Sequence, residues 1–305
     1  MSLAFPQASS ISDNGKAALL MVGAMGAFAF NDAIVKQAMT EISTAQLLTV
    51  RSTLASMLLL ALAAFRGELR GARAALRLPV IVRSLADIGA TLAYINALIH
   101  LPLANASAIY QALPLVVTLG AVIFLGERPG WRRWSSIALG FVGVMIIIRP
   151  GTDGFTVHSI SVLLSVAFSA LRDLVTRRLP ANVPSVFVST VTAISVGLVG
   201  FILLPFQGWQ PMTPTLTLSI VAAACAISLG YIAIVAAMRL GEVGFVTPFR
   251  YTILVFATIL GFVFFGDAPA LLDVVGAAIV VASGVFVFAR ERRLGRLAPL
   301  RNQVH

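Results

Sequence analysis

The chain has 305 residues, of which 59% are hydrophobic and only 11% are charged, and its mean hydropathy is +0.96. Soluble domains carry about 25% charged residues, so this composition excludes a water-soluble globular protein. The net charge of +10 would suggest a nucleic-acid partner in a soluble chain, but in a membrane protein it indicates arginines held in cytoplasmic connectors, and we expect no nucleic-acid binding. The composition therefore predicts an all-α polytopic membrane protein surrounded by the lipid bilayer.

Ten apolar runs follow one another along the chain, each close to the ~20 residues that a helix needs to cross a bilayer. A polar segment, residues 1–15, precedes them and lacks the basic start of a secretory signal, so we expect a disordered N-terminal tail. The connectors are short, and residues 291–305 form a basic cytoplasmic tail. The predicted transmembrane helices lie near residues 16–38, 45–65, 79–99, 104–125, 131–149, 157–178, 184–205, 215–238, 243–265 and 271–289.

Arginines are concentrated in alternate connectors. The connectors after the second, fourth and sixth spans are basic, whereas the others hold few basic residues, with Arg149 as the main exception. Because basic residues stay on the cytoplasmic side, we expect both termini in the cytoplasm. The arginines of the basic connectors are Arg66, Arg70, Arg73, Arg77, Arg128, Arg132, Arg133, Arg177 and Arg178.

Two similar motifs lie almost half the chain apart and indicate an internal duplication. Residues 124–129 read Phe-Leu-Gly-Glu-Arg-Pro, and residues 264–269 read Phe-Phe-Gly-Asp-Ala-Pro. Membrane transporters are often built from such repeats, and an odd number of spans per repeat turns the second copy upside down. We therefore expect an inverted 5+5 arrangement of ten helices, with residues 16–151 as the first five-helix repeat and residues 152–290 as the second.

This organisation resembles the drug/metabolite transporter superfamily, EamA type, over nearly the whole chain. The matching positions are a glycine–acid pair that ends one span of each repeat, followed by small residues that let helices approach closely. Pro114 fits the family's pattern, whereas Leu254 stands at its counterpart in the second copy. The other matching residues are Leu125, Gly126, Glu127, Ser136 and Gly143 in the first copy and Phe265, Gly266, Asp267, Gly276 and Ser283 in the second.

The resemblance implies a secondary transporter of the bacterial inner membrane that moves a small organic metabolite by alternating access. Protons are one candidate coupling ion, and the protein is expected as a monomer or a homodimer. The string at residues 31–36, Asn-Asp-Ala-Ile-Val-Lys, with Gln46 and Arg51, is similar to members that take up riboflavin or S-adenosylmethionine, and it implies uptake of such a cofactor-like solute. The alternatives are an amino-acid or drug/metabolite exporter of the same fold, and an intramembrane enzyme that uses Asp32, Asp87 or Asp173.

Polar residues inside the apolar runs are the candidates for substrate binding. An ionisable side chain at mid-bilayer costs roughly 2.5–3.5 kcal/mol on insertion scales, so each one needs a function or a partner. A looser internal match, between residues 27–32 and 167–173, places an aspartate in the opening span of each repeat. The candidate residues are Asn31, Asp32, Arg51, Asp87, Asn96, Tyr110, Gln111, Arg172, Asp173, Arg250 and Tyr251.

Each candidate also has a structural interpretation. Asp32 could pair with Lys36 or Arg51, and Asp87 could pair with Arg83, which lies one helical turn earlier. Two further features bear on the site. The neighbours Arg172 and Asp173 point to different sides of a helix, so we do not expect them to pair with each other. Tyr94 and Tyr110 are either anchors at the membrane interface or stacking partners for a flat substrate.

The sequence lacks the motifs that mark several common classes of enzyme and of binding site. It contains no ATP-binding G-x-x-x-x-G-K-[ST] loop, no G-x-S-x-G nucleophile elbow and no H-E-x-x-H zinc motif. The three histidines have no ligand spacing, and the single cysteine rules out a disulfide framework. We therefore expect no catalytic residue, no metal site and no cofactor.

Overall fold

The computed structural model describes residues 11–65, 78–125, 131–149, 156–176, 185–240 and 246–301. All regular elements in these ranges are helices, as the membrane environment requires. They are α1 (Ile11–Ala38), α2 (Thr44–Phe65), α3 (Leu78–His100), α4 (Leu103–Tyr110), α5 (Leu113–Leu125), α6 (Trp131–Ile148), α7 (Val157–Thr176), α8 (Ser185–Gln207), α9 (Pro214–Leu240), the 3₁₀ helix η2 (Thr247–Thr252), α11 (Ile253–Phe265) and α12 (Leu271–Arg301).

Within the described residues, 8 helical segments are long and apolar enough to cross a membrane. Two further apolar stretches are shorter, Ile137–Ile148 in α6 and Leu271–Phe286 in α12. Many large apolar side chains, such as Phe65 and Phe206, point outward from the bundle. In water such a surface would cause aggregation, whereas lipid solvates it, so the chain is a polytopic helical membrane protein.

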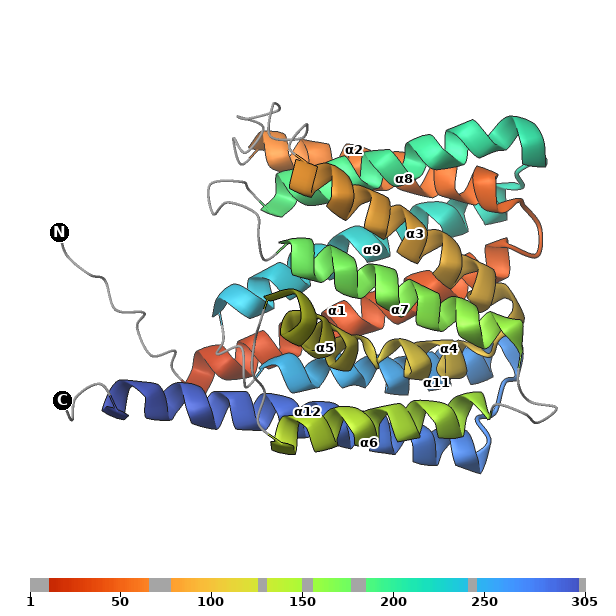
Figure 1. Cartoon of the computed structure of the whole chain (residues 1–305). Coiled ribbons are helices and arrows are strands. Elements are labelled where there is room, and N and C mark those ends of the chain that lie inside the picture. The colour runs from red at the N-terminus through yellow and green to blue at the C-terminus, as the bar shows by residue number, and fades with distance from the viewer. Residues whose placement is uncertain are drawn as a thin grey trace.

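The helices run back and forth between two ends of one bundle (Figure 1). At one end α2, α7 and α9 finish and α3 and α8 begin, and both ends of the described chain lie there too. We call it the basic end, because the connectors of residues 66–77, 126–130 and 177–184 carry the clustered arginines. The opposite end holds the connectors after α1, α3, α8 and α11, and α6 ends and α7 begins there.

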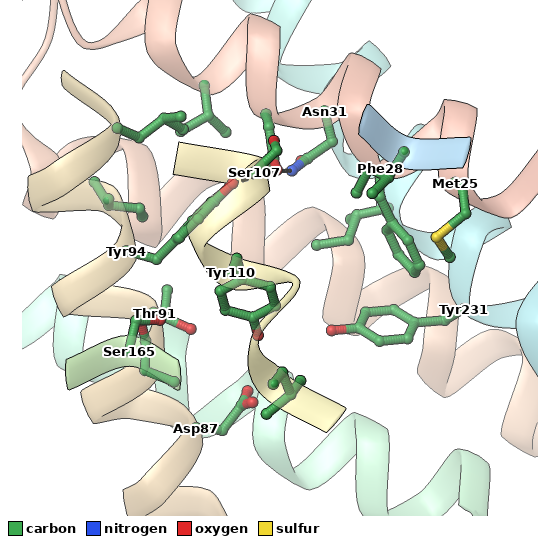
Figure 2. Close-up of a pocket in the computed structure, with 18 of the residues that line it drawn as sticks. Met25, Phe28, Asn31, Asp87, Thr91, Tyr94, Ser107, Tyr110, Ser165 and Tyr231 are labelled. Atoms are coloured by element: carbon green, nitrogen blue, oxygen red, sulfur yellow. Dashed lines mark hydrogen bonds between the residues drawn. The ribbon is translucent and has the colours of Figure 1, made fainter. Parts of the chain in front are cut away.

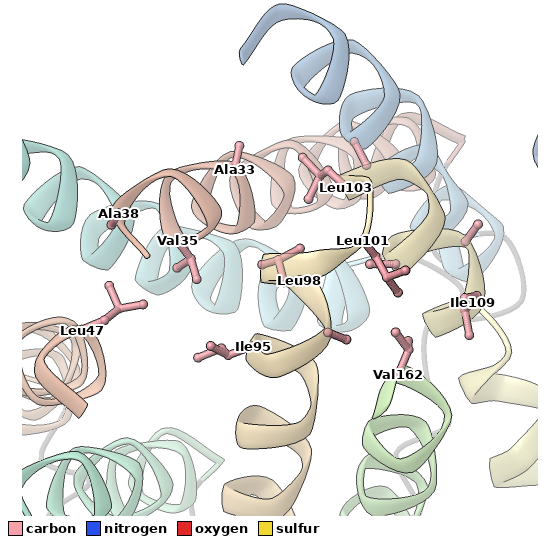
Figure 3. Packing of buried hydrophobic residues seen from close by; sticks show 14 of the residues in the cluster. Ala33, Val35, Ala38, Leu47, Ile95, Leu98, Leu101, Leu103, Ile109 and Val162 are labelled. Atoms are coloured by element: carbon pink, nitrogen blue, oxygen red, sulfur yellow. The ribbon is translucent and has the colours of Figure 1, made fainter. Parts of the chain in front are cut away.

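Helices of the first half pack mainly against helices of the second half. The most extensive contacts join α1 to α9, α2 to α8, α3 to α7 and α6 to α12. Near the end opposite the basic end, Val35, Leu47, Leu98 and Leu103 are almost fully buried and form a continuous apolar core with Val162 of α7 (Figure 3). The two halves therefore share one core.

The crossing of α6 and α12 brings two backbones into direct contact. A Cβ atom added to Gly143 would lie 2.8 Å from the carbonyl oxygen of Gly276, and one added to Gly276 would lie 2.7 Å from that of Gly143. No residue other than glycine fits at such a separation. The predicted packing role of the small residues is therefore confirmed at these two positions, while the side chain of Ser136 lies outside the description.

Two of the predicted spans, called the interrupted spans below, are not continuous α-helices. The run expected at residues 104–125 forms α4 and α5, separated at Gln111 and Ala112. Pro114 explains the interruption, since it has no N–H to donate to the carbonyl of Tyr110. The run expected at residues 243–265 begins with the 3₁₀ helix η2, which has Pro248 in its first turn, before α11 continues it.

Several boundaries differ from the sequence-based predictions. Residues 11–15, predicted as tail, belong to α1, and α12 extends to Arg301, into the predicted tail of residues 291–305. Gly266 ends α11 in the left-handed conformation at φ 70°, and Asp267 N–H donates to the carbonyl of Gly261, so this motif terminates a helix. Most of its first copy, residues 126–130, lies outside the described residues.

Candidate functional site

A cavity of about 240 Å³ lies in the middle of the bundle, where both interrupted spans contribute to its wall (Figure 2). Helices of both halves line it: α1, α2, α3, α4 and the start of α5 from the first, and α7, α9, η2 and the start of α11 from the second. Ligand sites in helical membrane proteins commonly occur at such discontinuous helices. Its polar lining comprises Asn31, Asp32, Arg51, Asp87, Thr91, Tyr94, Ser107, Tyr110, Gln111, Ser165, Arg172, Tyr231 and Arg250.

Asp32 is held by neutral hydrogen-bond donors. Its carboxylate accepts one bond from Asn31 Nδ2 at 2.9 Å and one from the Tyr94 hydroxyl at 3.1 Å. Arg51 Nη1 donates to Asn31 Oδ1 at 3.3 Å, so Asn31 connects Asp32 to Arg51. Lys36 instead donates to the carbonyl of Leu101, which argues against the proposed Asp32–Lys36 pair.

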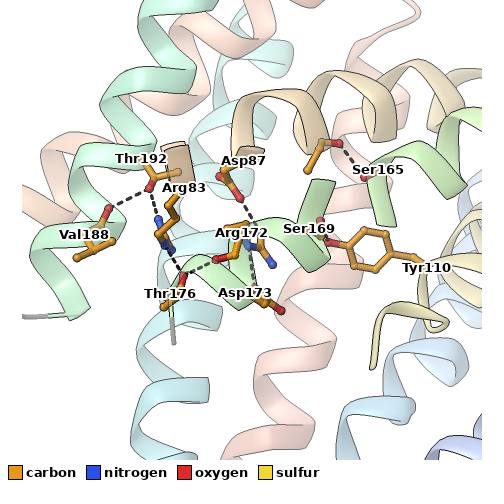
Figure 4. A network of polar contacts seen from close by, with 11 residues as sticks. Arg83, Asp87, Tyr110, Ser165, Ser169, Arg172, Asp173, Thr176, Val188 and Thr192 are labelled. Atoms are coloured by element: carbon orange, nitrogen blue, oxygen red, sulfur yellow. Dashed lines mark hydrogen bonds and ion pairs between the residues drawn. The ribbon is translucent and has the colours of Figure 1, made fainter. Parts of the chain in front are cut away.

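A second polar network joins α3, α7 and α8 (Figure 4). Arg172 Nη1 lies 2.6 Å from Asp87 Oδ1, and Arg172 Nε lies 3.0 Å from Asp173 Oδ1. The expectation that Arg172 and Asp173 would not pair was wrong, because the long arginine side chain reaches its neighbour's carboxylate while also contacting Asp87. Arg83 donates to Thr176 and Thr192, so the alternative Asp87–Arg83 pair is not what the structure describes.

A second cavity of about 250 Å³ extends from this network toward the basic end. Asp173 and Arg83 line the second cavity and are not part of the lining of the central one. The two cavities share six lining residues, which therefore form the partition between them: Arg51, Asp87, Thr91, Arg172, Ile227 and Tyr231.

Two aromatic pairs stand on different sides of the central cavity (Figure 2). Tyr94 and Tyr110 meet edge to face with centroids 5.2 Å apart, and Phe28 and Tyr231 do so at 5.4 Å. The Tyr110 hydroxyl also hydrogen-bonds to Ser169 Oγ at 2.8 Å. Such walls offer π-faces to a flat ring, and their hydroxyl groups offer hydrogen bonds to its edges.

Some residues at the interrupted spans line the cavity, and others pack against neighbouring helices. Gln111 Nε2 donates to the carbonyl of Arg250 at 3.4 Å, which joins the two interruptions. The Arg250 side chain lines the cavity and has no ion pair or hydrogen bond to any described residue. Tyr251 is 6% exposed and lies against Gly284 of α12, away from the cavity. Tyr251, which the sequence proposed as a substrate-binding residue, is therefore not part of the lining of either cavity.

Asn96 also lies outside the cavity. It is exposed on α3, and its carbonyl oxygen contacts His100 Nδ1 at 2.9 Å. The position of a polar residue within an apolar run indicates its depth in the membrane, but the rotation of the helix about its axis decides whether the side chain faces the cavity or the outside. Asn96 lies on the outer face of α3. Apart from Tyr251 and Asn96, every predicted candidate lines one of the two cavities.

Some lining residues were not among the predicted candidates. Phe28, Thr91 and Ser165 looked like ordinary packing residues in apolar runs, and nothing in the sequence distinguishes them. Tyr231 is detectable in the sequence, since it is the single aromatic hydroxyl in a long apolar span, and the sequence indicates Tyr94 as an interface anchor or a stacking partner. Among the described residues, no group of three or more His, Cys, Asp and Glu side chains could hold a metal ion.

Comparison with known protein families gives two matches along this chain. The model of the EamA-like transporter family matches residues 15–149 and again residues 158–289. The two matches correspond to the first and second halves of the bundle. A crystal structure of a protein with 22% sequence identity covers 92% of this chain and 99% of its own chain at a TM-score of 0.64, which supports the fold alone.

Three curated relatives are transporters with different named substrates. A riboflavin transporter of Rhizobium johnstonii is 30% identical over 67% of this chain and 68% of its own. An S-adenosylmethionine uptake transporter of Rickettsia felis is 23% identical over 63% of this chain and 65% of its own, so the alignment spans slightly less than two thirds of that relative. The pseudopaline exporter CntI of Pseudomonas aeruginosa is 24% identical over 87% of this chain and 93% of its own.

Proposed function

Because the chain belongs to the EamA-like transporter family, we propose that it is a secondary transporter that imports a small, flat, cofactor-like solute such as riboflavin. The family and the named relatives are transporters, so the intramembrane-enzyme alternative is not retained. The observation that carries the proposal is the central cavity, whose polar lining comes from both halves of the bundle. A site between two halves becomes accessible to each side in turn when one half rocks against the other.

The proposed rocking rests on an inverted 5+5 repeat with ten spans. In such a repeat α1 corresponds to α7 and α3 corresponds to α9, so a contact of α1 with α9 requires a matching contact of α7 with α3. Both contacts are among the most extensive in the bundle, which supports the repeat. One detail repeats too: the ring of Phe28 covers Gly230, and the ring of Phe168 covers Gly89. The family match in each half supports the same assignment.

We also propose that the basic end faces the cytoplasm, which places the protein in the bacterial inner membrane with both termini inside. The clustered arginines support this orientation through the positive-inside rule. The second cavity then opens toward the cytoplasm, and the central cavity lies further toward the outside. A solute entering from outside would meet Asp32 and Tyr94 before it reaches the partition at Asp87 and Arg172.

A flat solute is proposed because aromatic rings stand on two sides of the cavity. Stacking on an aromatic side chain contributes about 1–3 kcal/mol per nucleobase in single-strand-binding proteins, and the same physics applies to any flat heterocycle. Riboflavin has such a ring and is the named substrate of one relative, which supports the choice. The longer alignment with an exporter favours export as the second candidate, with the same site facing the cytoplasm first.

The experiment is solute uptake by the purified protein in liposomes. Radiolabelled riboflavin is supplied outside, with amino acids and S-adenosylmethionine in parallel, each with and without an imposed pH gradient. The proposal expects riboflavin accumulation above that of empty liposomes. Efflux without uptake, from loaded vesicles of known protein orientation, would instead support export. No movement of any of these solutes in either direction would contradict the proposal.

A further inference from the structure

The charged residues of the central cavity do not balance. Its described lining holds two carboxylates, Asp32 and Asp87, and three guanidinium groups, Arg51, Arg172 and Arg250. Arg172 pairs with Asp87, and Arg51 reaches Asp32 through Asn31. Arg250 has no such partner among the described residues, so one positive charge faces the cavity uncompensated.

The unpaired charged group of the cavity is a hydrogen-bond donor. Arg250 presents five N–H donors in a planar fork and has no acceptor. The buried hydroxyl of Ser107 lies beside that of Tyr94 and can donate or accept a hydrogen bond, so it does not discriminate between solutes. The carboxylate of Asp32 is already engaged by Asn31 and Tyr94. The unpaired positive charge of Arg250 therefore suits a solute that accepts hydrogen bonds or carries negative charge.

The backbone at Arg250 is joined to the other interrupted span. The residue lies in the 3₁₀ helix η2, and its carbonyl accepts the bond from Gln111 across the junction of the two interrupted spans. The planar guanidinium can bind two acceptor atoms at once, as in its pairs with carboxylates, phosphates and adjacent carbonyl oxygens. In a cavity of low dielectric constant, its charge would also repel a cationic solute.

We propose that Arg250 binds an anionic or carbonyl-rich edge of the transported solute, so that the cavity takes neutral or anionic flat solutes and rejects cationic ones. The inference rests on the proposed transport function and adds the substrate class to it. The inference predicts that this chain differs in charge preference from a carrier of sulfonium cations, although one named relative is an S-adenosylmethionine uptake transporter.

The test is equilibrium binding to the purified full-length protein in nanodiscs. The probes are riboflavin, which is neutral with a carbonyl-rich edge, riboflavin 5′-phosphate, which is anionic, and S-adenosylmethionine, which carries a sulfonium. The variants are Arg250→Gln and Arg250→Lys. Lys16→Gln is the matched control, because it also removes one positive charge but lies at the exposed start of α1. Thermal unfolding of each variant monitors folding.

We expect the unmodified protein to bind both flavins and to bind S-adenosylmethionine at least tenfold more weakly. Arg250→Gln should weaken flavin binding by about tenfold or more, as expected for a lost hydrogen bond to a charged group, and should not weaken binding of the sulfonium. Arg250→Lys should retain part of the affinity because it keeps the charge, and Lys16→Gln should bind as the unmodified protein does.

Three results would overturn the inference. Flavin affinity unchanged in Arg250→Gln, or tighter binding of S-adenosylmethionine than of both flavins by the unmodified protein, would overturn it and leave transport standing. Failure of the unmodified protein to bind any of the probes would contradict the proposed substrate as well. Should Arg250→Gln not fold, the charge preference of the unmodified protein decides alone.

Discussion

Arg172 on α7 and Asp87 on α3 form an ion pair of 2.6 Å that joins the two halves of the bundle and lies in the partition between the two cavities. On the proposed transport path, a solute that moves from one cavity to the other would meet this pair together with the other four residues of the partition. The side chains remain 20% and 14% exposed, so the pair is largely but not fully removed from solvent. Its position makes it the natural barrier on the proposed transport path.

We therefore expect Asp87→Asn to impair both folding stability and transport. Removing one partner of a fully buried ion pair costs about 3–5 kcal/mol, and the residual exposure here reduces the expected loss to about 2 kcal/mol. Uptake should fall by at least ~10-fold, because the state in which the partition separates the two cavities would lose the ion pair that stabilises it. Thermal unfolding and liposome uptake measure the two effects separately.

The matched control is Asp173→Asn, which removes the other carboxylate near Arg172 but outside the central cavity. The Asp173 side chain is 35% exposed, so the loss should be well below that of Asp87→Asn. The exchange Asp87→Arg with Arg172→Asp should recover part of the stability, because the opposite charges meet again. Equal effects of the two asparagine variants would contradict a special role for the Asp87–Arg172 pair.

A second prediction concerns proton coupling, for which we propose Asp32 as the carrier. Asp32 lines the cavity and lies next to the donors Asn31 and Tyr94, so its protonation would be coupled to occupation of the site. Asp32→Asn keeps the size and removes the titratable group. We expect it to abolish accumulation driven by an imposed pH gradient while exchange of labelled for unlabelled solute continues.

The control for Asp32→Asn is Asp13→Asn, an acid in the first turn of the same helix and far from the cavity lining. This variant should keep gradient-driven accumulation. If Asp32→Asn accumulates solute in response to the gradient as well as the unmodified protein does, protons do not bind at Asp32.

The sequence predicted the composition of the site better than its geometry. Charges in apolar runs are rare and costly, which is why Asp32 and Arg250 were recognisable without a structure. Their immediate environment depends on helix rotation and on local interruptions, which a hydropathy pattern does not encode. Arg250 and Tyr251 are neighbours in the chain, yet only Arg250 lines the cavity, because η2 turns Tyr251 toward Gly284.

For the fold too, the sequence predicted the individual elements but not how they pack together. Apolar runs and their connectors predicted the helices of the bundle, and Pro114 marked the position where one run divides into α4 and α5. The pairing of α1 with α9 and of α3 with α7 was beyond sequence reasoning, since these contacts join residues far apart in the chain. The cavity results from that pairing, so its small and apolar lining residues, such as Thr91, could not be recognised.

A third prediction tests the orientation of the bundle. In a Cys225→Ser background, Trp209→Cys introduces a thiol in the connector between α8 and α9, where Trp209 is 54% exposed. Glu68→Cys introduces one in the arginine-rich connector between α2 and α3. A membrane-impermeant maleimide should label the first in intact cells and the second only after permeabilisation. The reverse pattern would place the basic end outside.

The last prediction concerns the contact of α6 with α12. Gly143→Val places a branched side chain where even a Cβ would lie 2.8 Å from a backbone oxygen of Gly276. Because a backbone cannot move aside as a flexible side chain does, we expect a loss of about 1–3 kcal/mol and a lower melting temperature. Gly23→Ala is the control, since no heavy atom lies within 4 Å of its added Cβ, and replacing a helical glycine with alanine is favourable by roughly 0.5–1 kcal/mol. If Gly143→Val melts at the temperature of Gly23→Ala, the close approach of α6 and α12 does not exist in the folded protein.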